Sequence, residues 1–149
     1  MSLSKLNNLY REVILDHAQH PHNYGAITNA NYCATLENTS CGDLIHLQLY
    51  LNSQDTITHI GFTGNGCTIS QASASMMTDA IKGKTKEQAL LRAHIFSQMM
   101  LGVQCTQADL SLLQDAAILA VVVKFPTRIK CATLAWWSLK KALKENEGE

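Results

Sequence analysis

The sequence predicts an α+β fold in which a small three-stranded antiparallel sheet packs against helices. Changes in the spacing of the apolar residues lead to this class. Apolar residues recur every three or four positions over residues 3–20, alternate with polar residues over 32–63, and return to helical spacing from Ile69 onward. A chain of 149 residues is long enough to bury one core. We therefore expect a single domain spanning residues 1–149.

The first helix is predicted over residues 3–20 from one apolar stripe and a stop signal. The stripe contains Leu6, Leu9, Tyr10, Val13, Ile14 and His17. His20 precedes Pro21, and a residue before proline disfavours the helical conformation, so the helix should end there. Residues 21–31 are expected to form a loop.

Three short strands are predicted at residues 32–37, 45–51 and 56–63, where the apolar period becomes two. One buried face is expected on the middle strand, formed by Ile45, Leu47, Leu49 and Leu51. Residues 52–55 are Asn-Ser-Gln-Asp, all turn formers. The second and third strands should therefore be joined by a tight turn.

Two helices are predicted after the sheet. The first covers residues 69–81 and should stop at Gly83, because glycine commonly ends a helix. Thr85 and Gln88 have the spacing of a capping box. This spacing predicts the start of a helix over residues 86–101.

The C-terminal part is predicted to hold a short helix and a long one. Asp109 is a candidate N-cap for a helix over residues 110–117. The run Val121–Val123 is β-branched, and its pattern does not separate helix from strand. Pro126 should break the chain before a last helix over residues 128–144.

Charge and hydropathy argue against two kinds of partner. Twelve basic and twelve acidic residues cancel, and no block of like charge occurs, unlike in a nucleic-acid-binding protein. No cationic stretch leads into an apolar run at the N-terminus, so no secretory signal is recognised. The longest apolar run, 116–123, is far shorter than the roughly 20 residues of a membrane helix. We expect no nucleic-acid or membrane partner and a cytoplasmic location.

The five cysteines are an odd number in a chain without an export signal, which favours metal-binding or reactive thiols over disulfides. Cys41, Cys67 and Cys131 lie at predicted element boundaries, where ligands are usually presented. Together with Asp43 they would make a four-coordinate set suited to Zn²⁺. The spacing alone leaves open the alternative that they are small buried apolar residues.

Several sequence motifs carry a family resemblance. They are Leu9-Tyr-Arg-Glu-Val-Ile-Leu-Asp-His17, Thr39-Ser-Cys-Gly-Asp43, Gly64-Asn-Gly-Cys-Thr-Ile-Ser70, Ala72-Ser-Ala-Ser-Met-Met77 and Lys124-Phe-Pro-Thr-Arg-Ile-Lys-Cys-Ala-Thr-Leu134. Over nearly the whole chain these motifs resemble the IscU-like (NifU N-terminal-like) family of iron–sulfur cluster assembly proteins, and its SufU branch most closely. The resemblance implies an IscU/SufE-like fold and one metal site, formed by Cys41, Asp43, Cys67 and Cys131.

Two features favour the SufU branch. Lys130 precedes the last cysteine, where the IscU scaffolds typically have a histidine, and residues 98–123 resemble the insertion that marks SufU. The resemblance then implies a zinc-dependent acceptor of persulfide sulfur. Its partners would be a SufS-like cysteine desulfurase and a downstream iron–sulfur scaffold. The segment Ala120–Val123 departs from the glycine turn expected there.

Two other functions stay open. A scaffold would use the same four residues to hold iron in a [2Fe–2S] cluster, and a structural zinc domain would have no transfer role. Cys41 is the expected sulfur acceptor, because it lies between loop formers and Gly42 and has wide backbone freedom. Cys67 and Cys131 are expected at helix starts, where regular structure would hold them on the metal.

Other reactive residues are assigned to structure or left undecided. Cys33 lies in a predicted strand and Cys105 in the insertion, and neither matches the family site. Arg128 and Lys130 are cations at a helix start, where they either face the thiolates or are solvated. No two histidines have the spacing H-x₃-H, so no histidine is expected to be a ligand.

Overall fold

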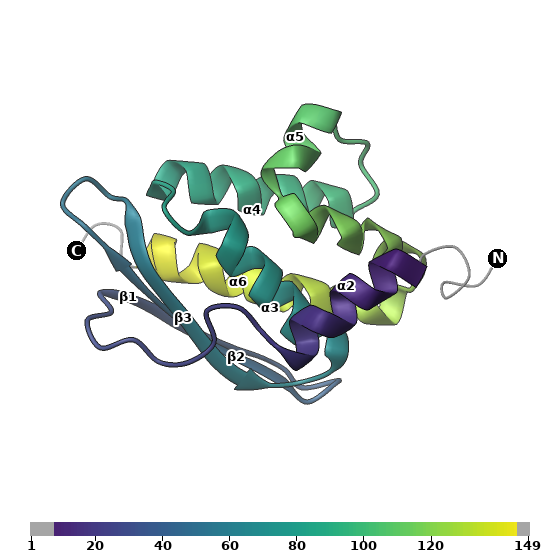
Figure 1. The fold of residues 1–149 in the computed structure, drawn as a ribbon, viewed down its shortest axis with the longest axis horizontal. Helices are drawn as coiled ribbons and strands as arrows, with labels where there is room; N and C mark the ends of the chain where they lie inside the picture. Colours follow the sequence, from purple (N-terminus) through teal and green to yellow (C-terminus); the bar gives the residue numbers. More distant parts are fainter. Residues whose placement is uncertain (1–7, 146–149) are drawn as a thin grey trace.

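A computed structural model describes residues 8–145 and shows a three-stranded antiparallel sheet with helices gathered over one face (Figure 1). The elements in chain order are α2 (Asn8–Gln19), β1 (Tyr32–Asn38), β2 (Asp43–Leu51), β3 (Ile57–Asn65), α3 (Thr68–Ile81), α4 (Lys86–Met100), α5 (Gln107–Leu112), the 3₁₀ helix η1 (Gln114–Lys124) and α6 (Pro126–Glu145). This arrangement confirms the predicted α+β class. Residues 3–7 of the first predicted helix lie outside the described residues.

The sheet has the order β1-β2-β3, so β2 is central. Leu36 pairs with Ile45 in the first ladder, and Leu47 pairs with Phe62 in the second. Burial alternates along the whole of β2. The predicted inward residues Ile45, Leu47, Leu49 and Leu51 are all buried. The helix α6 packs against β1 and β2.

The helices α3, α4 and α6 meet around Trp136. Its ring stacks on Phe96 of α4, with the ring centroids 4.4 Å apart. The indole N–H donates to Ser73 Oγ of α3 over 3.1 Å, and Ser73 in turn donates to the Ala132 carbonyl oxygen over 2.6 Å. These buried hydrogen bonds fix α3 relative to α6, so the segments that carry Cys67 and Cys131 have a defined separation.

Three details of the C-terminal part differ from the predictions. The short helix begins at Gln107 rather than at residue 110, because the Thr106 hydroxyl accepts a hydrogen bond from the Asp109 N–H and caps it. The run Val121–Val123 belongs to η1 and is neither strand nor α-helix. The last helix begins at Pro126 rather than at residue 128, since proline suits a first helical position, where its missing N–H has no partner to lose.

The predicted capping box at the start of α4 is present. Thr85 Oγ1 accepts from the Gln88 N–H over 3.2 Å, and the Gln88 side chain accepts from the Thr85 N–H over 3.0 Å. Replacing Thr85 by alanine is expected to lower the free energy of unfolding by about 1 kcal/mol in urea denaturation. The control Ser53→Ala, at an exposed turn residue, should leave it unchanged. Equal losses in the two variants would contradict the capping role.

Candidate metal centre

Cys41 lies in the turn that joins β1 to β2, and its side chain is exposed. The turn is closed by the N–H groups of Cys41 and Gly42, which donate to the Asn38 carbonyl oxygen over 3.2 and 2.9 Å. Gly42 has φ +75°, a left-handed conformation that L side chains rarely adopt. The glycine after Cys41 is therefore required by the turn that presents the thiol.

Asp43 is the first residue of β2, and only 1% of it is exposed. Its Oδ1 accepts from the Cys67 N–H over 2.9 Å and from Ser70 Oγ over 3.3 Å. Asn38 Nδ2 donates to Oδ2 over 3.5 Å. None of the ion pairs among residues 8–145 involves Asp43. A buried carboxylate without a cation is costly, so this position favours a bound positive ion.

Cys67 and Cys131 approach Asp43 from the helices. Cys67 is the N-cap of α3, and its side chain makes no capping hydrogen bond, so the thiol is free for another partner. Cys131 is buried and lies in the second turn of α6 rather than in the first turn, because the helix starts earlier than predicted. Its Sγ donates to Cys41 Sγ over 3.5 Å.

The structure groups three of the four predicted ligands, and Cys67 lies beside them as a hydrogen-bonding neighbour of Cys131 but outside the group. One ligand atom each from Cys41, Asp43 and Cys131 lies within 4.8 Å of the others. Burial raises the pKa of the Cys131 thiol, and hydrogen bonds with Cys41, Cys67 and Asp43 raise it further. The Cys131 thiol therefore keeps its proton unless a cation takes the proton's place. Three sulfurs and one carboxylate oxygen are donors that Zn²⁺ accepts, so the residues present fit zinc.

Two supporting residues were missed in the sequence. Ser70 donates to Asp43 and, over 3.0 Å, to the Cys67 carbonyl oxygen, and Asn38 both closes the turn and contacts Asp43. Such outer contacts orient the ligands of a metal site. A polar residue three positions after a candidate ligand at a helix start is the available sequence signal for Ser70.

Gly66 leaves the space that the Asp43 side chain occupies. A Cβ at this position would come within 2.6 Å of Asp43 Oδ1 and would also clash with Ser70 Oγ. Gly66→Ala is expected to displace both side chains and to weaken zinc binding by about 10- to 100-fold, the usual effect of disturbing the outer contacts of a metal site. Competition with a chromogenic chelator measures this change. The neighbouring exposed Asn65→Ala is the control, and unaltered affinity in Gly66→Ala would refute the steric argument.

The remaining reactive residues lie apart from this cluster or at its edge. Cys33 is exposed on β1, and the Cys105 thiol donates to the Val103 carbonyl oxygen over 3.5 Å. Arg128 and Lys130 are exposed in the first part of α6, and neither forms any of the ion pairs within the described chain.

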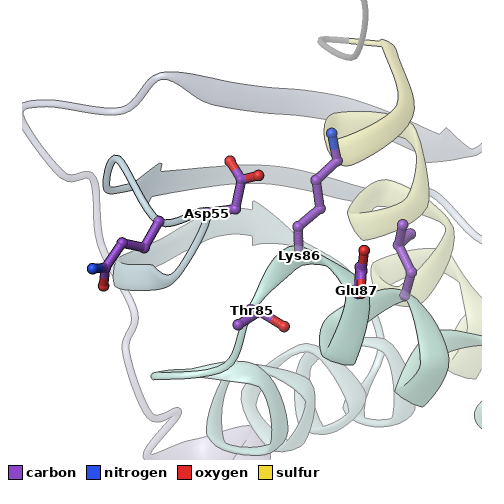
Figure 2. A pocket seen from close by; sticks show the side chains of 6 residues that line it. Asp55, Thr85, Lys86 and Glu87 are labelled. Carbon is purple, nitrogen blue, oxygen red and sulfur yellow. The ribbon is translucent and has the colours of Figure 1, made fainter.

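A polar pocket of about 380 Å³ lies at the far end of α3, around the start of α4. Figure 2 shows Asp55, Thr85, Lys86 and Glu87 around it, a mixture of opposite charges. The 14 residues of α3 separate this pocket from Cys67 by about 20 Å. It contains no cysteine and contributes nothing to the metal centre.

Comparison with known proteins decides the family. The family model of the NifU-like N-terminal domain matches residues 9–145. The chain belongs to this family. The expected family and fold are therefore confirmed.

Relatives of this NifU-like chain carry two different functional names. A Streptococcus pyogenes protein named iron–sulfur cluster assembly scaffold protein IscU is 50% identical over 147 residues, which cover 98% of this chain and 89% of that protein. A Bacillus subtilis protein named zinc-dependent sulfurtransferase SufU is 46% identical over 146 residues, which cover 97% and 96%. The names of the two relatives thus match the two leading functions considered above.

Solved structures agree with this family fold. A Fervidobacterium islandicum protein, named as a candidate scaffold for iron–sulfur cluster assembly in the SUF system, superposes with a TM-score of 0.81 at 36% identity, covering 89% of this chain and 94% of that one. A nitrogen-fixing NifU-like protein from Brucella abortus superposes with a TM-score of 0.83 at 17% identity, covering 97% and 98%. The second likeness concerns the fold alone.

Proposed function

We propose that this chain is a zinc-dependent sulfur acceptor that takes persulfide sulfur from a cysteine desulfurase for iron–sulfur cluster assembly. One observation carries the proposal. Cys41 is exposed in a turn, whereas its neighbours Cys131 and Asp43 are buried. A thiol that moves between a metal site and a partner needs this exposure, and the ligands that stay behind need to be held by regular structure.

The proposed reaction is thiol–persulfide exchange. The Cys41 thiolate attacks the terminal sulfur of the persulfide on the desulfurase cysteine. A new S–S bond forms on Cys41, the old S–S bond breaks, and its electron pair leaves on the desulfurase cysteine as a thiolate. Zinc, when bound by Cys41, Asp43, Cys67 and Cys131, would supply the positive charge that keeps these sulfurs ionised.

A groove beside Cys41 supports docking of a protein that carries the sulfur. Its volume is about 290 Å³, and its lining includes Ser40, Lys130 and Trp137. Trp137 is 49% exposed although it is a large aromatic residue. Aromatic residues such as tryptophan are enriched in protein interfaces relative to the rest of the surface. We assign this groove to the desulfurase side of the site.

Further parts of the proposal rest on the family. The 46% identical relative named zinc-dependent sulfurtransferase supports the zinc and the transfer function. We propose that residues 98–123, which form the end of α4, α5 and most of η1, are the insertion of the SufU branch. A downstream iron–sulfur scaffold would receive the sulfur in the cytoplasm. Within residues 8–145, no helix has the length and apolar character needed to cross a membrane.

The proposal is tested by adding the purified zinc protein to a cysteine desulfurase with cysteine as substrate. We expect faster turnover of the desulfurase and, in the absence of reductant, a persulfide that mass spectrometry maps to the peptide containing Cys41. A persulfide on Cys67 or Cys131 instead would overturn the assignment of the acceptor. Turnover equal to that of the desulfurase alone would overturn the transfer function.

A second candidate function is a scaffold that assembles a [2Fe–2S] cluster on the same ligands. The 50% identical relative named as a scaffold favours it. Supplying iron and sulfide without oxygen separates the two functions. For a sulfur acceptor we expect little cluster and retained zinc, whereas a stoichiometric [2Fe–2S] spectrum that passes to an apo-ferredoxin would establish the scaffold.

A further inference from the structure

Two histidines and an aspartate meet in a second cluster near the C-terminal end of α3. His17 comes from α2, His22 from the loop that follows it, and Asp79 from α3. One possible ligand atom from each of these three residues lies within 4.8 Å of the others. The two imidazole rings have centroids 4.5 Å apart. Asp79 is twelve residues beyond Cys67 along the same helix, so the cluster lies about 18 Å from the cysteine site.

His22 and Asp79 form a hydrogen-bonded pair, in which a proton lies where a metal ion would bind. His22 Nδ1 and Asp79 Oδ2 are 2.5 Å apart, close enough to share one proton. Both side chains are partly exposed, 46% for His22 and 31% for Asp79, so an ion in solution can reach them. Imidazole and carboxylate together are ligands for zinc and for other divalent transition metals.

His17 is already oriented in the way that a metal-binding histidine usually is. Its side chain is 3% exposed, and both ring nitrogens have partners. Nδ1 lies 2.7 Å from Ser75 Oγ, and Nε2 lies 3.0 Å from Asp115 Oδ2 of η1. Whichever nitrogen binds an ion, the other keeps a hydroxyl or carboxylate partner, as histidine ligands almost always do. Ser75 Oγ also accepts from the His22 N–H over 2.7 Å, which ties the two histidines to one residue of α3.

We propose that His17, His22 and Asp79 form a second metal site, which binds a divalent transition-metal ion such as Zn²⁺ or Co²⁺. Three protein ligands leave one coordination position for water, so this site is open. The charge of the site favours a divalent cation, because the carboxylates of Asp79 and Asp115 balance the two positive charges of the ion. Binding would join α2, its following loop and α3 to η1, most of which lies in the 98–123 segment.

The test adds Co²⁺ to protein that already holds zinc at its cysteines and follows binding by dialysis and visible absorption. We expect about one further equivalent of metal, with d–d bands but without the near-ultraviolet charge-transfer band of a cobalt–thiolate bond. His22→Ala and Asp79→Asn should each lower the affinity at least about tenfold. His20→Ala, an exposed histidine two residues from His22, is the matched control.

Zinc retained at the cysteines shows that each variant is folded, and it keeps the two sites distinguishable. Several results would overturn the proposal: no further equivalent, a charge-transfer band that reveals exchange at the cysteines, or equal affinity in the His22, Asp79 and His20 variants. The readout does not depend on sulfur transfer, so it stands apart from the test of the proposed function.

Discussion

Cys41→Ala is expected to reduce desulfurase turnover to the rate of the desulfurase alone. Cys41 is exposed in a turn, whereas Cys67 is half-buried at the start of α3 and Cys131 and Asp43 are buried. Removing its sulfur removes the nucleophile itself. The measurement is sulfide release or alanine formation from cysteine under saturating acceptor.

Two controls make this result specific. Cys33→Ala removes another exposed thiol, on β1, and should keep full stimulation. Zinc content should be measured in Cys41→Ala, because a variant that keeps metal and fold but has lost stimulation separates transfer from stability. Stimulation that survives in Cys41→Ala, with the persulfide found on another cysteine, would contradict the assignment.

Cys131→Ala is expected to lose both zinc and stability. The Cys131 side chain is buried against Cys41, and its pKa is raised by burial and by its neighbours, so a cation contributes most at this position. Loss of a ligand should lower the zinc affinity by more than the roughly 100-fold that is lost when outer contacts are disturbed. If zinc is present at 100 times its dissociation constant, losing the bound zinc lowers the free energy of unfolding by about 2.7 kcal/mol. Metal analysis and thermal unfolding with and without chelator measure the two effects.

The control for this prediction is Cys105→Ala, which removes a half-buried thiol whose hydrogen bond goes to a carbonyl oxygen of its own loop. It should keep zinc and unfold at nearly the wild-type temperature. Chelator should lower the unfolding temperature of wild type and leave Cys131→Ala unchanged, since that variant has no metal to lose. Full zinc occupancy in Cys131→Ala would remove it from the ligand set.

Local patterns were sufficient to predict much of this fold. The alternation in β2 and the capping box at Thr85 involve residues that are neighbours in the sequence, and the structure has both. The extent of η1 was not predictable in the same way. Its residues pack against α3 and α4, and such tertiary contacts override weak local preferences. The 3₁₀ conformation of Val121–Val123 is one result.

The candidate site, too, could be predicted from the sequence only in part. The cysteines and Asp43 stand out by residue type and by the family motifs, and the structure places Cys41, Asp43 and Cys131 in one group with Cys67 at its edge. The contact between His22 and Asp79 joins segments far apart in the sequence, and no spacing rule relates them. Ser70 supports Asp43 from another element, 27 positions further along the chain. Partnerships of this kind appear only when α2, α3 and β2 have been assembled.

The order of the proposed ligands along the chain has a further consequence for how the metal holds the protein together. Cys41 and Asp43 share one turn, whereas Cys67 and Cys131 belong to distant helices. A bound ion would cross-link these three regions and so reduce the conformational entropy of the unfolded chain, much as a disulfide does. If Cys41 detaches, Asp43 still anchors the same turn. Every long loop closed by the cross-link stays closed, and the acceptor thiol can leave without loosening the topology of the domain.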